Sequence, residues 1–89
     1  MADLIRSAAV GTDASGDVIV TVSPAAETQI LIHSTLQAQF GAAMEKTVRE
    51  TLDARQLTAR VELQDRGALD WILRARLETA LDRAKEEKI

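Results

Sequence analysis

The sequence predicts a small α+β sandwich: a mostly antiparallel sheet of about four strands with two helices on one face, in the order β-β-β-α-β-α. Apolar side chains alternate with period two in four short segments, which is typical of strands. In two longer segments they recur at three- and four-residue spacing, which is typical of amphipathic helices. The length of 89 residues suits one compact domain. We therefore expect a single domain over residues 1–89, with a C-terminal tail that frays from about residue 85.

The clearest strand pattern is "DVIVTVSP", residues 17–24. Its residues Val18, Val20 and Val22 share one face, and β-branched side chains favour the pleated backbone. Pro24 has no N–H to donate to a continuing ladder, so we expect the strand to end there.

Two weaker strands flank it. "QILIHS", residues 29–34, alternates in the same way after the turn-forming "SPAAET". "IRSAAVGT", residues 5–12, is expected to pair back against residues 17–24 across a tight connection. The stretch "GTDASGD", residues 11–17, is therefore predicted to be a hairpin tip, where Gly, Asp and Ser are the usual residues.

The first helix is predicted from Leu36 to about Arg55. Its start resembles a capping box, in which the Ser34 hydroxyl and the Gln37 side chain each bond a free backbone amide. The apolar stripe is expected to face the core, and its members are Leu36, Phe40, Met44, Val48 and Leu52.

The remaining chain predicts one more strand and one more helix. Ala59, Val61 and Leu63 alternate with polar residues, as in a strand with one dry face. After "DRG", a second helix is expected from Ala68 to about Lys85. Its apolar stripe comprises Leu69, Ile72, Leu73, Leu77, Ala80, Leu81 and Ala84.

Composition and charge narrow the function classes. The net charge is −3 and aromatic residues make up only 2% of the chain, which argues against a nucleic-acid or anionic-membrane partner. There are no cysteines, so any thiol chemistry needs a thiol from elsewhere. No segment has the length of an apolar membrane span or resembles a signal peptide. We expect a soluble, cytoplasmic protein that works with proteins or small molecules.

The predicted tip places the hydroxyl of Ser15 between two carboxylates, Asp13 and Asp17. A serine nucleophile needs a base, but the only histidine, His33, falls within a strand and there is no G-x-S-x-G elbow. The two acids alone are too few for a calcium loop. We therefore expect no catalytic residue and no metal site, and we interpret both acids as solvated turn residues.

Three side chains of the second helix could serve a partner. Arg74 and Arg76 could grip an anion, but residues two apart do not share a helix face, so a surface role is favoured. Trp71 lies at the edge of the apolar stripe, where it is either a docking anchor or, as we favour, part of the rim of the core.

Three blocks in the same order resemble the acyl carrier subunit, or gamma chain, of citrate lyase: "GTDASGDVIVTV", "FGAAMEKTVRETL" and "DRGALDWILRARLETALDRA". The resemblance implies that Ser15, in the "SGD" tip, is esterified through a phosphodiester to 2'-(5''-phosphoribosyl)-3'-dephospho-CoA. The terminal thiol of this arm would carry an acetyl and then a citryl group, which supplies the missing thiol. The chain departs from the family at Ala14, where an acidic residue is familiar, and at Trp71, where a smaller residue is common.

The same resemblance implies partners rather than an activity of the chain itself. The alpha subunit would exchange acetyl for citryl on the arm, the beta subunit would cleave citryl to oxaloacetate, and a prosthetic-group transferase (holo-carrier synthase) would load the serine. The acyl carrier of malonate decarboxylase has a similar "SGD" tip and is the nearest alternative. An unmodified protein-interaction module is the other alternative, because small acidic α+β domains often bind through a sheet edge or a helix face.

Overall fold

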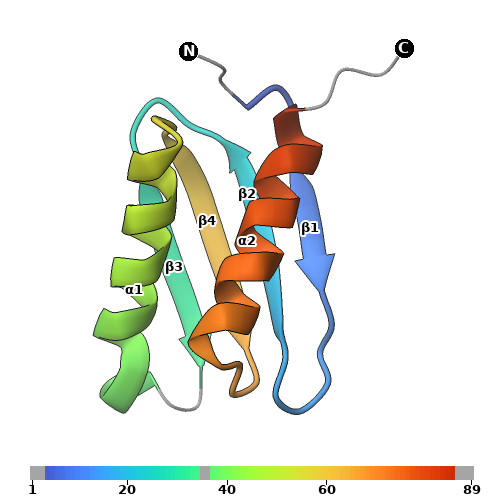
Figure 1. The fold of residues 1–89 in the computed structure, drawn as a ribbon, viewed down its shortest axis with the longest axis vertical. Helices are drawn as coiled ribbons and strands as arrows, with labels where there is room; N and C mark the ends of the chain where they lie inside the picture. The colour runs from blue at the N-terminus through green and yellow to red at the C-terminus, as the bar shows by residue number, and fades with distance from the viewer. Residues whose placement is uncertain (1–3, 35–36, 86–89) are drawn as a thin grey trace.

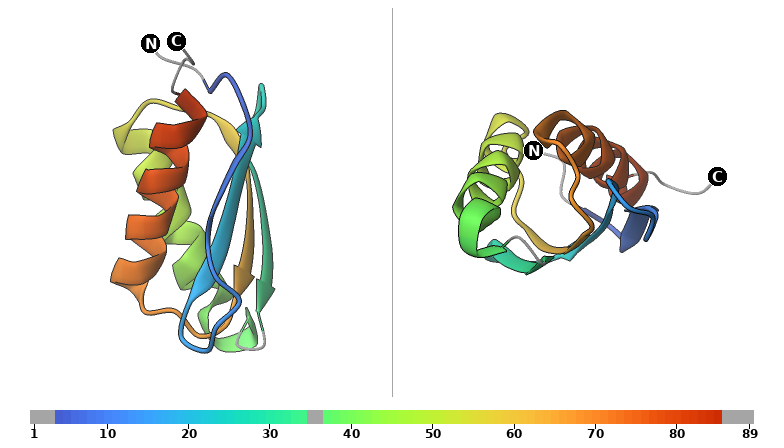
Figure 2. Two further views of the ribbon diagram at one scale, coloured as in Figure 1. Left: turned by 90° about the vertical axis from the view of Figure 1, so that its right-hand side faces the viewer. Right: turned by 90° about the horizontal axis from the view of Figure 1, so that it is seen from below.

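The computed structural model describes residues 4–34 and 37–85. Within these residues, four strands form one sheet, and two helices lie side by side on one of its faces (Figures 1 and 2). The predicted fold class and element order are therefore confirmed. The elements are β1 (Ala8–Gly11), β2 (Val18–Pro24), β3 (Gln29–Ser34), α1 (Gln37–Ala54), β4 (Ala59–Asp65) and α2 (Asp70–Lys85).

The strand order in the sheet is β1-β2-β4-β3. β2 pairs antiparallel with β1 and with β4, whereas β3 pairs parallel with β4. The predicted hairpin between β1 and β2 is confirmed, with Ala8 opposite Val22 and Gly11 opposite Ile19. β3 and β4 run in the same direction because α1 provides the long crossover that parallel strands require. β4 thus lies between β2 and β3, which are neighbours in the sequence.

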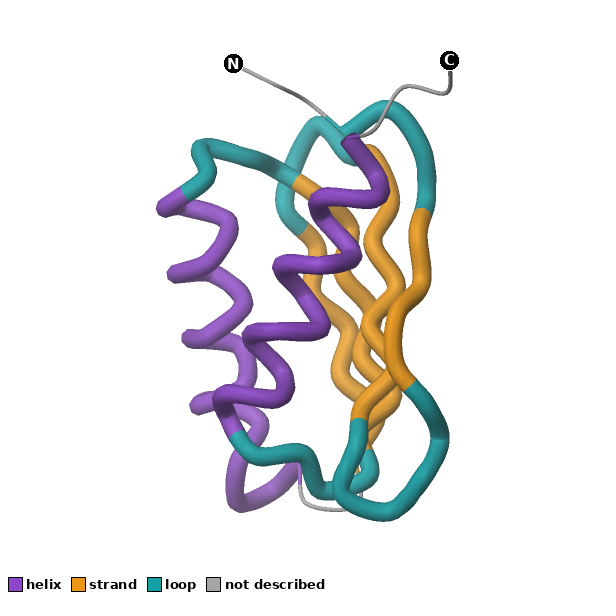
Figure 3. The backbone as a smooth tube through the Cα atoms, turned by 45° about the vertical axis from the view of Figure 1, so that its right-hand side comes forward, coloured by secondary structure: helices purple, strands orange, loops and turns teal. Residues whose placement is uncertain are grey.

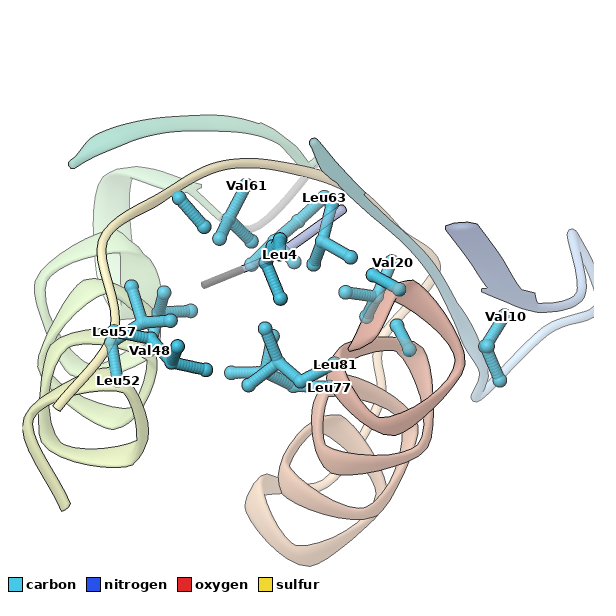
Figure 4. Packing of buried hydrophobic residues seen from close by; sticks show 14 of the residues in the cluster. Leu4, Val10, Val20, Val48, Leu52, Leu57, Val61, Leu63, Leu77 and Leu81 are labelled. Atoms are coloured by element: carbon cyan, nitrogen blue, oxygen red, sulfur yellow. The ribbon is translucent and has the colours of Figure 1, made fainter. Parts of the chain in front are cut away.

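The core lies between the sheet and the two helices (Figure 4). The inward faces of β2 and β4 are almost completely buried, as their period-two patterns predict. The helices add buried side chains that close the core from the other side. These helix residues are Val48 and Leu52 of α1, and Leu73, Leu77, Ala80, Leu81 and Ala84 of α2.

Three predictions about apolar residues are wrong. The helical spacing places Phe40 and Leu69 in the buried stripes and Trp71 at the rim of the core, but their exposed fractions are 51%, 61% and 68%. The first two line a groove of about 370 Å³ that stays open between the beginning of α1 and the beginning of α2. The spacing itself is helical, but the helices do not cover one another at this end. Leu36, the first residue of the predicted stripe, lies outside the described residues.

The predicted ends of the helices hold to within a few residues. α2 begins at Asp70 rather than at Ala68, because the Asp65 carboxylate accepts the Ala68 amide and the Leu69 carbonyl accepts the first helical bonds. The Gln37 side chain of the predicted capping box and the tail beyond residue 85 lie outside the described residues. Over residues 4–34 and 37–85, no helix is long and apolar enough to cross a membrane.

Candidate functional site

Ser15 lies in an exposed turn in the loop that joins β1 and β2. Figure 3 shows this loop at one end of the sheet. The Asp17 amide donates to the Ala14 carbonyl at 3.1 Å, so Ser15 and Gly16 are the central residues of a four-residue turn. Gly16 has a φ of 83°, as the second central residue of a type II turn requires. The hydroxyl of Ser15 has no hydrogen-bond partner among residues 4–34 and 37–85. The predicted exposed tip is therefore confirmed, with its hydroxyl available to an incoming reagent.

The tip is held against the connection between β4 and α2. The Gly16 amide donates to the Arg66 carbonyl at 2.7 Å, and the Arg66 amide donates to the Asp17 carbonyl at 2.9 Å. These bonds continue the β2–β4 pairing beyond Val18 and Asp65, its last partners in the ladder. Figures 1 and 3 show the two loops together at one end of the molecule. The turn is thus attached to the rest of the domain directly after Ser15.

The Asp17 carboxylate accepts hydrogen bonds from three residues and is only 13% exposed. Thr12 donates from its amide at 3.1 Å and from its hydroxyl at 2.6 Å. The Val18 amide donates at 2.8 Å, and the guanidinium of Arg76 donates twice, at 3.1 and 3.0 Å. The bonds from Thr12, then those from Val18 and Arg76, lower the pKa of Asp17 from 3.8 to about 2, because each favours the charged form.

A second ion pair lies on the outside of the tip. The Arg66 guanidinium donates to both Asp13 oxygens, at 2.8 and 3.3 Å. More than half of each side chain is exposed, so solvent and salt screen this pair.

The interpretation of Asp13 and Asp17 as solvated turn residues is therefore wrong for Asp17. It also misses the partner of Arg76, which is 59 residues away in the sequence. Helix periodicity relates each arginine only to other residues of its own helix. A contact between residues so far apart in the sequence leaves no such local pattern. Arg74 does remain at the surface, where it pairs with Asp70 one turn earlier.

Lowering the pH is expected to weaken the hydrogen bonds by which the Asp17 carboxylate stabilises the tip. Its pKa is about 2 in the folded protein and 3.8 in the reference state, so the unfolded chain takes up the proton first as the pH falls. The stability that the carboxylate contributes is thus fully present above about pH 4 and is lost progressively toward pH 2. We expect the melting temperatures of wild type and Asp17→Asn to differ at pH 6 and to converge near pH 2. A constant difference between pH 6 and pH 2 would contradict this assignment.

The described residues do not form a catalytic site around Ser15. His33 is exposed on the open face of the sheet, and its Nε2 lies 2.9 Å from a carboxylate oxygen of Glu62. In the described part of the chain no hydrogen bond joins His33 to Ser15, the contact by which a histidine base activates a serine. The same residues contain no group of three or more His, Asp or Glu side chains placed to hold a metal ion.

Fold and site together define a small α+β domain in which the exposed Ser15 hydroxyl, unbonded among the described residues, lies on a loop held by hydrogen bonds to the β4–α2 connection. Residues 5–84 match the family model for acyl carrier proteins described as malonate decarboxylase delta subunit (MdcD). Among curated proteins, the citrate lyase acyl carrier protein of Yersinia enterocolitica is 44% identical, with 97% of this chain and 92% of the relative covered. That of Serratia proteamaculans is 46% identical over 91% of this chain and 82% of the relative.

The chain therefore belongs to the family of acyl carrier proteins that includes those of citrate lyase, as the three sequence blocks indicated. It is accordingly a carrier subunit and not an enzyme. One chain of a Pseudomonas malonate decarboxylase hetero-tetramer, crystallised with malonate, has a similar fold. The TM-score is 0.70, the identity is 24%, and the match covers 90% of this chain and 84% of the other. This likeness shows the fold alone.

Proposed function

We propose that the chain is the cytoplasmic acyl carrier subunit of citrate lyase, with 2'-(5''-phosphoribosyl)-3'-dephospho-CoA attached to Ser15 through a phosphodiester. The observation that carries the proposal is the hydroxyl of Ser15, which is exposed and unbonded among the described residues in a family of acyl carriers. When bound, the arm supplies the thiol that this chain, which has no cysteine, lacks. The protein supplies an attachment point and a surface that its partners contact.

The surroundings of Ser15 fit a bulky substituent. A Cβ atom built on Gly16 would have no atom within 4 Å apart from those of Gly16 and its two chain neighbours, so the space beside the serine is open. The two acids of the tip are each paired with an arginine, which limits their repulsion of a phosphodiester placed nearby. A turn attached to the sheet and to the β4–α2 connection also presents the hydroxyl in one orientation, which favours reaction with a transferase.

The partners that this function requires are a prosthetic-group transferase (holo-carrier synthase), an alpha subunit that is the acyl transferase and a beta subunit that is the citryl lyase. The arm would carry acetyl and citryl thioesters between the last two while citrate is cleaved to oxaloacetate and acetate. We propose no nucleic-acid or membrane partner.

The acyl carrier of malonate decarboxylase is a second candidate function, favoured by the description of the matching family and by the fold of the structural neighbour. Relatives named for citrate lyase reach 44% and 46% identity, against 24% for the malonate decarboxylase chain. The sequence distance therefore favours the citrate system. The remaining alternative, an unmodified protein-interaction module, requires that Ser15 carry no prosthetic group.

Intact-mass measurement tests the proposal. Protein purified from cells that contain the citrate lyase genes is expected to carry the mass of the arm, located by peptide mapping on the fragment with Ser15. Pull-down of the alpha and beta subunits distinguishes the citrate system from the malonate system, which the mass alone does not. An unmodified Ser15 in active lyase would overturn the proposal.

A further inference from the structure

We propose that Asp17 and Arg76 are positioning residues, which together fix the orientation of the Ser15 hydroxyl for loading by the transferase. This inference rests on the proposed function, because it assumes that Ser15 receives the arm. Neither residue touches the reacting oxygen in this proposal. They act through the backbone of the turn.

The first support is the set of bonds that converge on one carboxylate. Asp17 closes the turn with its backbone, while its side chain bonds Thr12 on the incoming strand side and Val18 at the start of β2. Ser15 lies within this loop. A carboxylate that bonds both ends of a short segment restricts the conformations that the segment can adopt.

The second support is the element to which the carboxylate is anchored. Arg76 belongs to α2, which packs against both β1 and β2. Its Nε and Nη2 each bond a different Asp17 oxygen, at 3.1 and 3.0 Å, so the pair is bidentate and fixes an angle as well as a distance. The turn is therefore tied to a helix of the core as well as to the β4–α2 connection.

The third support is that the Asp17 carboxylate is shielded from a partner by its low exposure and by its hydrogen bonds within the domain. Its side chain is 13% exposed and receives five hydrogen bonds, two of them from a cation. Asp13 by contrast is 62% exposed. The acidic residue that follows "SG" in the tip therefore acts inside the domain, whereas the Asp13 carboxylate is exposed beside the Arg66 guanidinium.

The test compares Arg76→Gln with Arg74→Gln in the full-length, unloaded protein. Arg74 is the matched control, because it lies on the same helix and its ion pair, with Asp70, is on the surface. Hydrogen exchange of the Gly16 amide reports on the turn directly, since that amide bonds the Arg66 carbonyl. We expect exchange about tenfold faster in Arg76→Gln and unchanged in Arg74→Gln, while the amides of β4 exchange as in wild type.

Loading kinetics give the functional readout. With purified transferase and prosthetic-group donor, kcat/KM for modification of Ser15 is expected to fall about tenfold or more in Arg76→Gln. Arg76→Lys, which keeps the charge but loses the bidentate geometry, should recover part of the rate. If Arg76→Gln does not fold, Asp17→Asn takes its place in both measurements, because it removes the charge with almost no change of shape.

Loading of folded Arg76→Gln within twofold of Arg74→Gln would overturn the inference. Equal acceleration of exchange at Gly16 and throughout β4 would also overturn it, because it would indicate a general loss of stability. Failure of the proposed function is separate: the wild-type protein would then not be loaded at all, whatever Gly16 exchange shows.

Discussion

Replacing Ser15 with alanine is expected to abolish attachment of the prosthetic group completely. In the proposed function the phosphodiester forms at the Ser15 oxygen, and alanine has no atom that could take its place. The measurement is the intact mass after incubation with transferase and donor: wild type gains the mass of the arm and Ser15→Ala gains none. Because the wild-type side chain is exposed and makes no hydrogen bond with the described residues, we expect the stabilities of the two proteins to agree within about 0.5 kcal/mol.

Ser7→Ala is the matched control, since Ser7 is also exposed and lies close to β1, outside the tip. It should be loaded at the wild-type rate. Full loading of Ser15→Ala would place the arm on another residue and would contradict both the site and the positioning role of Arg76. Loss of loading in both variants would point to damage to the hairpin instead, and the unfolding curves would reveal it.

The element pattern of the fold could be read from the sequence, but the strand order could not. In β2 and β4, the alternation of apolar residues identifies the face that packs against the core. In α2, the spacing of the buried residues identifies the face that meets the same core. The position of β4 between β2 and β3 depends instead on where α1 places the returning chain. Nothing within a single strand specifies which neighbour it will have.

The site shows the same division between local and distant information. The turn residues around Ser15 predict an exposed tip, because Gly16 adopts the positive φ that glycine allows at low cost. The bond between Asp17 and Arg76 joins residues 59 positions apart, so it depends on the packing of α2 across the hairpin. The prediction for Trp71 is wrong for a related reason: helical spacing gives the angle of a side chain but not whether another element covers it.

Gly11, the last residue of β1, is expected to tolerate alanine poorly. Its φ is 117°, which side chains rarely adopt, and a Cβ built there would lie 1.8 Å from the Val18 carbonyl oxygen and 2.9 Å from the carbonyl carbon. Both atoms are backbone, so the two strands must move apart at the base of the tip. Adding the strain of the backbone to that of the overlap gives an expected loss of about 3 kcal/mol or more in the free energy of unfolding, measured by urea denaturation.

Gly16→Ala separates these two causes. Gly16 also has a positive φ, of 83°, but a Cβ atom at this residue would meet nothing within 4 Å beyond Gly16 and its two chain neighbours, so only the backbone strain applies. We expect a loss of about 1 kcal/mol for this variant. The larger effect should therefore occur at the residue farther from Ser15, because close contact between the strands of the hairpin, rather than freedom at its tip, makes glycine necessary. A loss for Gly11→Ala no greater than that for Gly16→Ala would contradict the close approach of β1 to Val18.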